Sequence, residues 1–400
     1  MRMKKIRRLG IRPISQFELE GIMFKKLGEE AKQIGKKALI VTGKHFAKSS
    51  GLLDKAKKML KENDVEFVEF SEIESNPESN TVDKGGELAR KKNVDFIVAI
   101  GGGSVIDASK GIATVTVSKH PVWDYCERPP KAKVPDNTLP ILAVITVAAT
   151  GSEADAGGVI TNSKTRSKRS LWGESLFPKT SIVDPLLTLS VPKKQTVDGV
   201  IDMIIHILES YLSSHALSPV SDRVSENLMK EAMKQGEIII NDPQNIDTRE
   251  SLSWISTLAL SGFPNAGRSG PMPMHALEHP ISGLYKISHG RGLAALLPSF
   301  LYHTKEMHSD RLKLLGKSIF STDSPTKTIE RLVHWMKKID AFTSLKKLGI
   351  KKESIEKFTL MAIEDANANG IIHAREPLAK EKIMQIYETA YNYKDLFRKV

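Results

Sequence analysis

Two stretches in the second half of the sequence place carboxylate and imidazole side chains one helical turn apart. Asp202 and His206 are four residues apart, and so are His275 and His279, with His289 following them. Residues i and i+4 of a helix lie on one face, so each pair would point at one region. A set of one oxygen and three nitrogens would suit Fe(II) or Zn(II) with room for a substrate oxygen; its members would be Asp202, His206, His275 and His289. A single helical histidine is as readily a hydrogen-bonded core residue, so spacing alone leaves metal binding and core packing both open.

A second candidate site is a glycine-rich turn in the first half. Residues 101–104 read Gly-Gly-Gly-Ser and directly follow an apolar run that ends at Ile100. Glycines let a phosphate approach the backbone, and the N-terminus of the helix that follows would offer free N–H groups. The pattern is not the G-x-G-x-x-G fingerprint of the ordinary Rossmann fold. Its place after a buried strand nevertheless favours a phosphate-binding turn over a purely structural loop.

The end of the first expected strand bears on which nucleotide would bind. Dinucleotide domains that prefer NAD usually place an acid where it can bond the ribose 2′-hydroxyl. Here Val41 and Thr42 lead into Gly43 and Lys44, with no acid in place. A 2′-phosphate would meet no repulsion there, and the Lys44 ammonium could pair with it. The sequence therefore favours NADP over NAD.

Alternating strand and helix patterns predict the fold of the first half. The expected strands cover 37–42, 65–70, 94–100 and 139–147, and the expected helices 51–62 and 81–92. Such βαβ units imply a mostly parallel sheet covered on both faces. After Pro192 the β-branched runs nearly vanish, and helical periodicity predicts helices over 194–213, 219–239, 248–263, 274–285, 290–304, 325–339 and 353–366. We therefore expect a Rossmann-like α/β domain over 1–188 and an all-α domain over 189–400.

The composition argues against nucleic acid and membranes as partners. The net charge of +12 is scattered in lysine pairs, which favours a solvated, thermally tolerant surface over a basic nucleic-acid-binding stripe. The single Cys126 excludes an intrachain disulfide and a cysteine-based zinc site, and indicates a reducing compartment. The basic N-terminus is not followed by an apolar signal region, and no run has the length of a membrane span. A soluble cytoplasmic protein is expected.

Taken in order, several segments resemble the iron-containing (group III) alcohol dehydrogenases, nearest their NADP-dependent butanol dehydrogenase and aldehyde reductase branch. The similarity covers nearly the whole chain, and the matching segments are 101–110, 146–153, Asp184-Pro185, 202–211 and 275–290. The resemblance implies the dehydroquinate synthase-like architecture of that family. It also implies hydride transfer between NADP(H) and a small primary alcohol or aldehyde bound to Fe(II) or Zn(II), in a homodimer.

The resemblance implies roles for individual residues. The metal ligands would be Asp202, His206, His275 and His289. The residues implied in cofactor binding are Gly102, Gly103, Ser104 and Asp107 at the pyrophosphate, Asn76 at another cofactor contact, Thr146, Thr150 and Ser152 around the nicotinamide half, Lys168 at the ribose, and Leu187 at the cofactor wall. His279 matches a position near nicotinamide and substrate. We expect it to relay a proton to solvent; the alternative is a supporting histidine packed beside the ligands.

Two departures from the family pattern matter. Gly43 replaces the acid of NAD-preferring members, which supports NADP binding near Gly43 and Lys44. Residues 264–274, with Pro264, Pro271 and Pro273, are individual to this chain and are expected to shape the substrate pocket.

Two other enzyme classes use the same scaffold. A polyol dehydrogenase resembling glycerol dehydrogenase is the closer alternative. A lyase resembling dehydroquinate synthase, which uses NAD only transiently, fits the Asp202/His206 helix less well.

Overall fold

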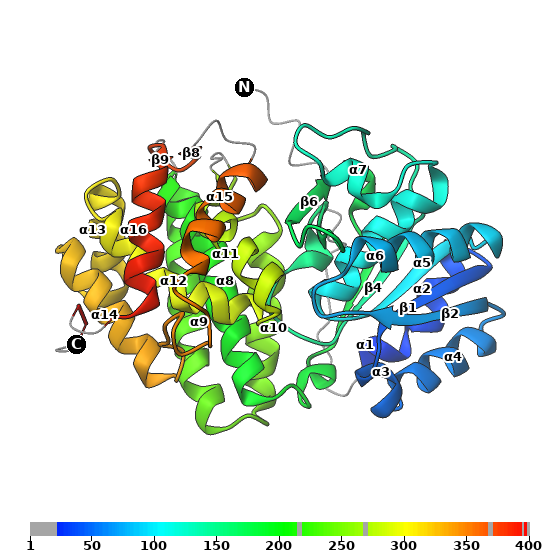
Figure 1. Cartoon of the computed structure of the whole chain (residues 1–400). Helices are drawn as coiled ribbons and strands as arrows, with labels where there is room; N and C mark the ends of the chain where they lie inside the picture. The colour runs from blue at the N-terminus through cyan, green and yellow to red at the C-terminus, as the bar shows by residue number, and fades with distance from the viewer. Residues whose placement is uncertain (1–21, 214–217, 267–270, 367–370, 394–395, 398–400) are drawn as a thin grey trace. The chain divides into compact units, whose positions relative to one another are not determined.

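The structure is a computed structural model that describes residues 22–213, 218–266, 271–366, 371–393 and 396–397 (Figure 1). The chain divides into two compact units. Unit 1 holds the described residues up to Thr165 together with Arg169–Val191. Unit 2 holds Arg166–Lys168 together with the described residues from Pro192 onward.

Unit 1 is built on a five-stranded parallel sheet in the order β2-β1-β3-β4-β7. The strands are β1 (Lys37–Gly43), β2 (Glu66–Ile73), β3 (Phe96–Gly101), β4 (Ile141–Ile145) and β7 (Thr180–Val183). The three central strands are almost wholly apolar and buried, as a sheet covered on both faces requires. The predicted Rossmann-like parallel sheet is therefore confirmed.

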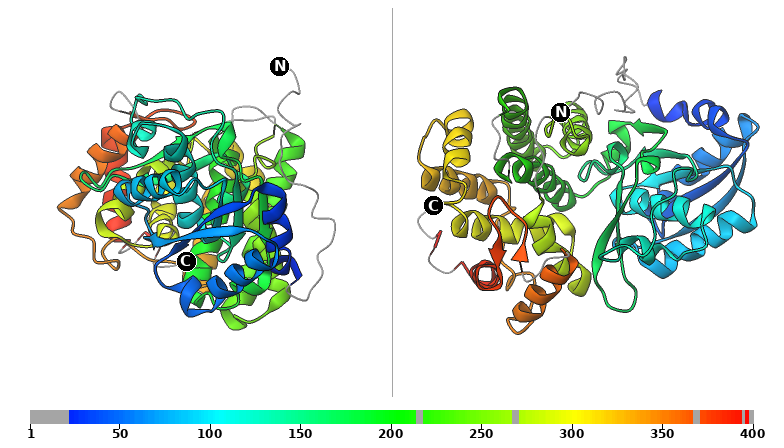
Figure 2. Two further views of the ribbon diagram at one scale, coloured as in Figure 1. Left: turned by 90° about the vertical axis from the view of Figure 1, so that its right-hand side faces the viewer. Right: turned by 90° about the horizontal axis from the view of Figure 1, so that it is seen from above.

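Helices cover both faces of this sheet because successive side chains of a strand point to opposite sides. The covering helices are α2 (Leu27–Ile34), α4 (Leu52–Glu62), α5 (Ser79–Lys91) and α6 (Gly103–Val117) (Figure 2). Leu39 and Val41 of β1 join a core with α5 and α6. Their neighbours Ala38 and Ile40 join a second core with α2 and α4.

Shorter elements complete unit 1, and none of them was predicted from the sequence. They are α1 (Ile22–Lys25), α3 (Phe46–Ser49), α7 (Val122–Cys126), the strand pair β5 (Gly157–Thr161) and β6 (Lys168–Trp172), and the 3₁₀ turns η2 (Ser152–Ala154), η3 (Glu174–Leu176) and η4 (Pro185–Thr188). Elements this short carry too few residues for a periodic apolar pattern.

Unit 2 is a helical bundle, as predicted. Its helices are α8 (Lys193–Ser213), α9 (Pro219–Asn241), α10 (Ile246–Leu260), α11 (Pro273–Tyr285), α12 (His289–His303), α13 (Ser309–Leu315), α14 (Pro325–Lys338), α15 (Ser354–Asp365) and α16 (Lys380–Tyr391). A π-helical turn, η5 (Gly316–Phe320), and a small antiparallel pair, β8 (Ile371–Ile372) with β9 (Leu378–Ala379), accompany them. The seven predicted helices all form, whereas α13 and α16 were not predicted.

Helix α8 is the central helix of unit 2. Every residue from Thr196 to Ser213 is buried, and α8 packs against α9, α10 and α12. A helix that is buried on all sides lies inside a bundle. Polar side chains on α8 therefore need partners within unit 2.

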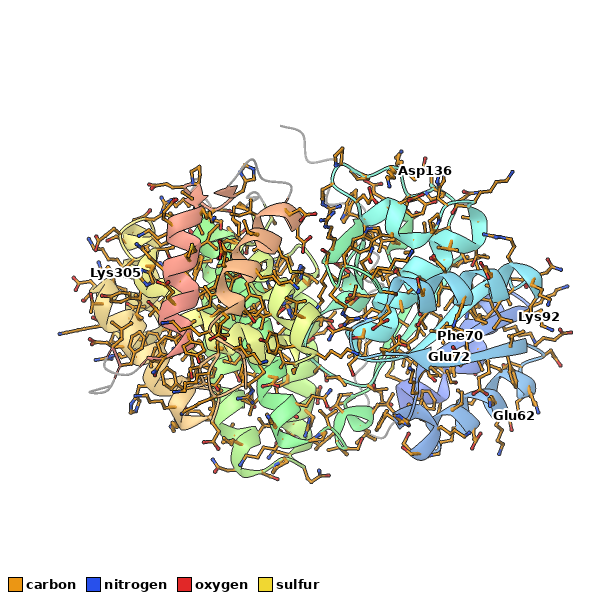
Figure 3. The ribbon with its side chains drawn as sticks, in the orientation of Figure 1. Glu62, Phe70, Glu72, Lys92, Asp136 and Lys305 are labelled. Atoms are coloured by element: carbon orange, nitrogen blue, oxygen red, sulfur yellow. The ribbon has the colours of Figure 1, made fainter. Side chains whose placement is uncertain are left out.

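The charged surface agrees with the scattered charges of the sequence. Glu62, Lys92 and Asp136 are exposed at separate places in unit 1, whereas Phe70 is buried (Figure 3). Among the described helices, none is long and apolar enough to cross a membrane.

Candidate functional site

Helix α8 presents three polar side chains along one buried face. Asp202, His206 and Glu209 follow each other at intervals of four and three residues, and all three are buried. Burying charged groups without partners would be costly, so their surroundings decide what they do.

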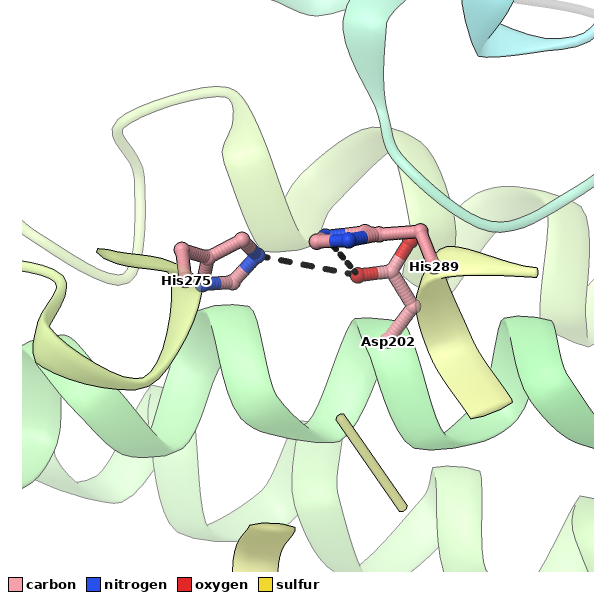
Figure 4. A group of neighbouring side chains, drawn as sticks. All are labelled: Asp202, His275 and His289. Atoms are coloured by element: carbon pink, nitrogen blue, oxygen red, sulfur yellow. Dashed lines mark ion pairs between the residues drawn. The ribbon is translucent and has the colours of Figure 1, made fainter. Parts of the chain in front are cut away.

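Asp202 meets His275 of α11 and His289 of α12 in one cluster (Figure 4). The three residues each offer one ligand atom, and these atoms lie within 4.8 Å of one another. Nε2 of His275 is 3.7 Å from Oδ1 of Asp202, and Nε2 of His289 is 3.9 Å from the same oxygen. Both separations are too long for a hydrogen bond but suit ligands around one cation.

Whether these atoms already have hydrogen-bond partners shows whether a metal would fit between them. Oδ1 of Asp202 and Nε2 of His275 are buried and have no hydrogen-bond partner. Buried polar atoms normally have one, so two such atoms facing each other call for a bound group. A carboxylate oxygen with imidazole nitrogens is a donor set for Fe(II) or Zn(II). The residues present therefore fit a metal of this kind.

The fourth expected ligand, His206, lies beside this cluster but is not one of the three. Its ring centroid is 4.4 Å from that of His275. Its Nδ1 is 2.9 Å from the backbone carbonyl oxygen of Asp202 and 3.3 Å from Oδ1 of the same residue. Burial, helped by the neighbouring imidazoles, lowers the pKa of His206 to about 4. The ring is therefore neutral near pH 7, which is the form that binds metals.

Two buried carboxylates that were not predicted as site residues hold two of the candidate ligands. Glu209 pairs through Oε2 with Nδ1 of His275, and Glu278 of α11 pairs through Oε2 with Nδ1 of His289. Burial lowers the pKa of His275, but the charges of Glu209 and Asp202 outweigh that effect and raise it to about 10. Glu209 shares the face of Asp202 at i+7, so helical spacing could have found it.

His279 lies close to the cluster without joining it. Its ring centroid is 6.5 Å from that of His275 and 5.8 Å from that of His289. Burial and the charge of Lys168 lower the pKa of His279 well below its ordinary value. Lys168 donates from Nζ to Oγ of Ser282, at 3.2 Å. The structure therefore places a neutral imidazole next to the candidate ligands.

In unit 1, the glycine turn joins β3 to the start of α6. Gly102 precedes the helix, and α6 begins at Gly103. A Cβ at Gly103 would overlap Oγ1 of Thr150, so only glycine permits this approach. Ser104 donates from Oγ to the backbone carbonyl of Ser75. The first N–H groups of α6 lie at the carboxyl ends of the strands, as a phosphate site requires.

Asp107 and Ser152 connect α6 to the segment after β4. Oγ of Ser152 donates to Oδ1 of Asp107, and the backbone N–H of Val159 donates to Oδ2 at 2.9 Å. The buried Lys110 donates to the backbone carbonyl of Ser152 at 2.8 Å. Thr146 donates its backbone N–H to Gly101, at 3.0 Å. The segment that carries the expected nicotinamide contacts is thus fixed to the glycine turn.

The carboxyl ends of β1 and β2 carry an ion pair beside Gly43. Nζ of Lys44 lies 3.1 Å from Oε1 of Glu74. Oγ1 of Thr81 donates to the same oxygen at 3.1 Å, and Oε2 of Glu74 is buried without a partner. The end of β1 itself carries no acid, and this acid follows β2, so the residues around Gly43 alone do not reveal it.

Two more expected cofactor residues lie in unit 1. Asn76 is half-buried in the loop between β2 and α5. Leu187 is half-buried in η4 and packs against the core on the α2 and α4 side of the sheet.

Comparison with known proteins gives one consistent family. Residues 20–185 match the family described as iron-containing alcohol dehydrogenase, and residues 196–391 match the C-terminal region of the same family. NADH-dependent butanol dehydrogenase A of Clostridium acetobutylicum is 34% identical over 373 residues, covering 91% of this chain and 95% of that protein. A 1,3-propanediol dehydrogenase of Citrobacter freundii is 32% identical, covering 91% of this chain and 94% of that protein.

A solved structure agrees with these sequence matches. The crystal structure of NADH-dependent butanol dehydrogenase A from Thermotoga maritima superposes with a TM-score of 0.88 at 33% identity, and covers 92% of this chain and 95% of that one.

Proposed function

The chain belongs to the iron-containing alcohol dehydrogenase family, and from that premise we propose that it interconverts small primary alcohols and aldehydes with NADP(H) as hydride carrier. The observation that carries the proposal is the buried cluster of Asp202, His275 and His289 with its two unpartnered ligand atoms. In the reaction, the alcohol carbon gives a hydride to oxidised nicotinamide and the hydroxyl gives a proton, which leaves the aldehyde.

Asp202, His275 and His289 would hold the metal, and His206 would complete the set through its Nε2. The Nδ1 atom of His206 faces the carbonyl of Asp202, which leaves Nε2 as its available ligand atom. When bound, Fe(II) or Zn(II) supplies the Lewis acidity that lowers the pKa of an alcohol and polarises a carbonyl.

His279 is our candidate for moving the hydroxyl proton. One side of its ring hydrogen-bonds the backbone of Lys168, so the other ring nitrogen would accept the proton. Because burial holds its pKa well below the ordinary value, the ring is neutral and its other nitrogen is free to accept a proton.

NADP(H) is our preferred cofactor over NAD(H). The glycine turn and the start of α6 would bind the pyrophosphate, which would lie closest to the backbone of Gly102, Gly103 and Ser104. Lys44 is half-exposed and would pair with a 2′-phosphate in place of Glu74. An aldehyde reductase of Escherichia coli, 31% identical over 70% of this chain, is named NADPH-dependent.

A diol or polyol dehydrogenase is the second candidate, because a 1,3-propanediol dehydrogenase is among the relatives. Rates with butyraldehyde, 3-hydroxypropanal and dihydroxyacetone would separate these substrate classes.

We further propose a cytoplasmic homodimer. The buried single thiol of Cys126 supports the reducing compartment, and sedimentation analysis tests the dimer.

The deciding experiment follows NADPH and NADH oxidation with butyraldehyde under anaerobic conditions. Metal-stripped protein is compared with samples reloaded with Fe(II) or Zn(II). Turnover that one metal restores, and that is faster with NADPH, supports the whole proposal. Faster turnover with NADH overturns the cofactor preference alone. No turnover with either metal and either cofactor overturns the proposed reaction.

A further inference from the structure

We propose that Glu209 and Glu278 are positioning residues that fix His275 and His289 for binding through Nε2 and set the affinity of the site for a divalent cation. This inference rests on the proposed function, because it concerns the same metal site. It adds two residues whose effect on the metal passes through the ligands that they contact.

Glu209 fixes His275 and the start of α11 together. Its Oε1 accepts the backbone N–H groups of Met274 and His275, while its Oε2 pairs with Nδ1 of the His275 ring. The first N–H groups of a helix have no partner inside it, so a carboxylate reaching them from α8 caps α11. The same side chain therefore sets where α11 begins and how the His275 ring is turned.

Glu278 holds the ring of His289 in the same way. It is fully buried on α11 and pairs through Oε2 with Nδ1 of His289, at the first residue of α12. Oγ of Ser282 donates to the same oxygen at 3.1 Å. A Cβ at residue 292 would overlap Oε1 of Glu278, so Gly292 leaves the space that this carboxylate occupies. The contact joins α11 to α12 at the site.

His206 provides an internal comparison. Its Nδ1 faces a neutral backbone carbonyl, whereas Nδ1 of His275 and of His289 each face a full carboxylate. A carboxylate that accepts from Nδ1–H raises the basicity of the other ring nitrogen and holds the ring's orientation. The Nε2 atoms of His275 and His289 would therefore be stronger metal ligands than that of His206. The two carboxylates would also add negative charge on the side of each ring away from the metal.

Replacing each glutamate by glutamine should affect metal binding to a different extent at the two positions. Glu209 receives three donors on its two oxygens, so a glutamine would present its own N–H₂ to at least one of them. Oε1 of Glu278 has no partner, so a glutamine there can turn its N–H₂ to that side and keep the contact with His289. Glu209→Gln should therefore weaken metal binding more than Glu278→Gln.

The test measures zinc and cobalt dissociation constants of the full-length metal-free protein by chelator competition. Glu209→Gln should bind roughly 100-fold, and Glu278→Gln roughly 10-fold, more weakly than the wild type. Glu226→Gln is the matched control: Glu226 is equally buried in unit 2 but accepts from Tyr211 at 2.8 Å instead of facing a histidine. The control should bind as the wild type does.

Each outcome has one meaning. Wild-type affinity in both Glu209→Gln and Glu278→Gln would overturn the inference and leave the proposed function standing. Equal weakening in the Glu226→Gln control would also overturn it, because the effect would then be general to buried carboxylates. Failure of the wild type itself to bind either metal would overturn the proposed function and the inference together.

A second measurement needs no variant and so does not depend on a mutant folding. Two-bond ¹H–¹⁵N correlation spectra of the zinc-loaded wild type identify the nitrogen that each imidazole uses for the metal. Coordination of His275 and His289 through Nε2, with Nδ1 protonated, supports the inference. Coordination of either ring through Nδ1 would overturn it.

Discussion

Oδ1 of Asp202 and Nε2 of His275 lie 3.7 Å apart inside unit 2, and neither atom has a hydrogen-bond partner. Each belongs to a side chain that is otherwise held in place: Asp202 by its position on the buried α8, and His275 by Glu209. The site is therefore preorganised, and a cation held between the two atoms would satisfy both of them. Metal binding at this site can therefore be tested through the stability of the protein as well as through its activity.

Metal binding should raise the thermal stability of the protein. A ligand that binds only the folded state at 100 times its dissociation constant stabilises it by about 2.7 kcal/mol. We expect Zn(II) to raise the melting temperature of the stripped wild type, and Asp202→Asn to remove most of that rise. Differential scanning calorimetry of both proteins, with and without Zn(II), checks this. An undiminished rise in Asp202→Asn would place the metal elsewhere.

Replacing His275 should remove the metal and the activity together. His275→Ala deletes a ligand atom and leaves Glu209 buried without its imidazole partner. We expect metal content, measured by atomic emission, to fall in parallel with turnover. Full metal content and full rate in His275→Ala would show that the ligand assignment is wrong.

His279→Ala should slow turnover while the metal stays bound. The ring lies near the ligands but makes no part of the three-residue cluster, so its loss removes proton transfer and leaves the ligands. General acid–base groups typically contribute about 10²–10⁴-fold to a rate. The measurement pairs kcat with metal content. Loss of metal from His279→Ala would instead identify a supporting role beside the ligands.

Much of the candidate metal site was predictable from the sequence. Asp202 and His275 were found because the four-residue spacing of each helix shows which side chains share a face. Glu209 and Glu278 were missed, since a glutamate on a helix usually faces solvent, and their partners lie on other helices. For Glu209 the partner is 66 residues away. Only the packing of α8 against α11 shows that this carboxylate is buried.

Local sequence patterns predicted many elements of both units and missed others. Strands β1 to β4 and most of the long helices follow their apolar periods, so these elements were predicted, whereas β7 and α2 were not. Helix α16 was predictable too, because Ile383, Ile386, Tyr387 and Ala390 follow helical spacing, yet it was overlooked. The acid near Gly43 was missed for a different reason. Glu74 directly follows β2, and only the parallel pairing of β1 with β2 brings it beside Lys44.

The Lys44–Glu74 pair should tune cofactor preference. Because Glu74 competes with a 2′-phosphate for the Lys44 ammonium, Glu74→Gln should lower the KM for NADPH and leave that for NADH higher or unchanged. Lys44→Ala should raise the KM for NADPH by about 10-fold, which corresponds to about 1.4 kcal/mol for one charged contact. Steady-state kinetics with both cofactors decides. Equal changes for NADPH and NADH would remove Lys44 from 2′-phosphate recognition.

Acid should destabilise the folded chain through His308, which precedes α13. The side chain is fully buried, and burial, together with the charge of Arg375, lowers its pKa from the ordinary 6.5 to about 4. Between these two values the unfolded chain binds a proton that the folded chain does not. Stability is therefore complete above about pH 6.5 and falls as the pH drops toward 4, by up to about 3 kcal/mol.

A variant without the titrating ring isolates this contribution. His308→Leu keeps an apolar side chain in the buried position and removes the proton site, so its unfolding free energy should fall less between pH 7.5 and pH 4. Urea titrations of metal-free protein across that range give the difference. His334→Leu, at an exposed position on α14, is the matched control and should follow the wild type. Parallel curves for His308→Leu and the wild type would contradict the prediction, because the proton taken up on acid unfolding would then belong to other groups.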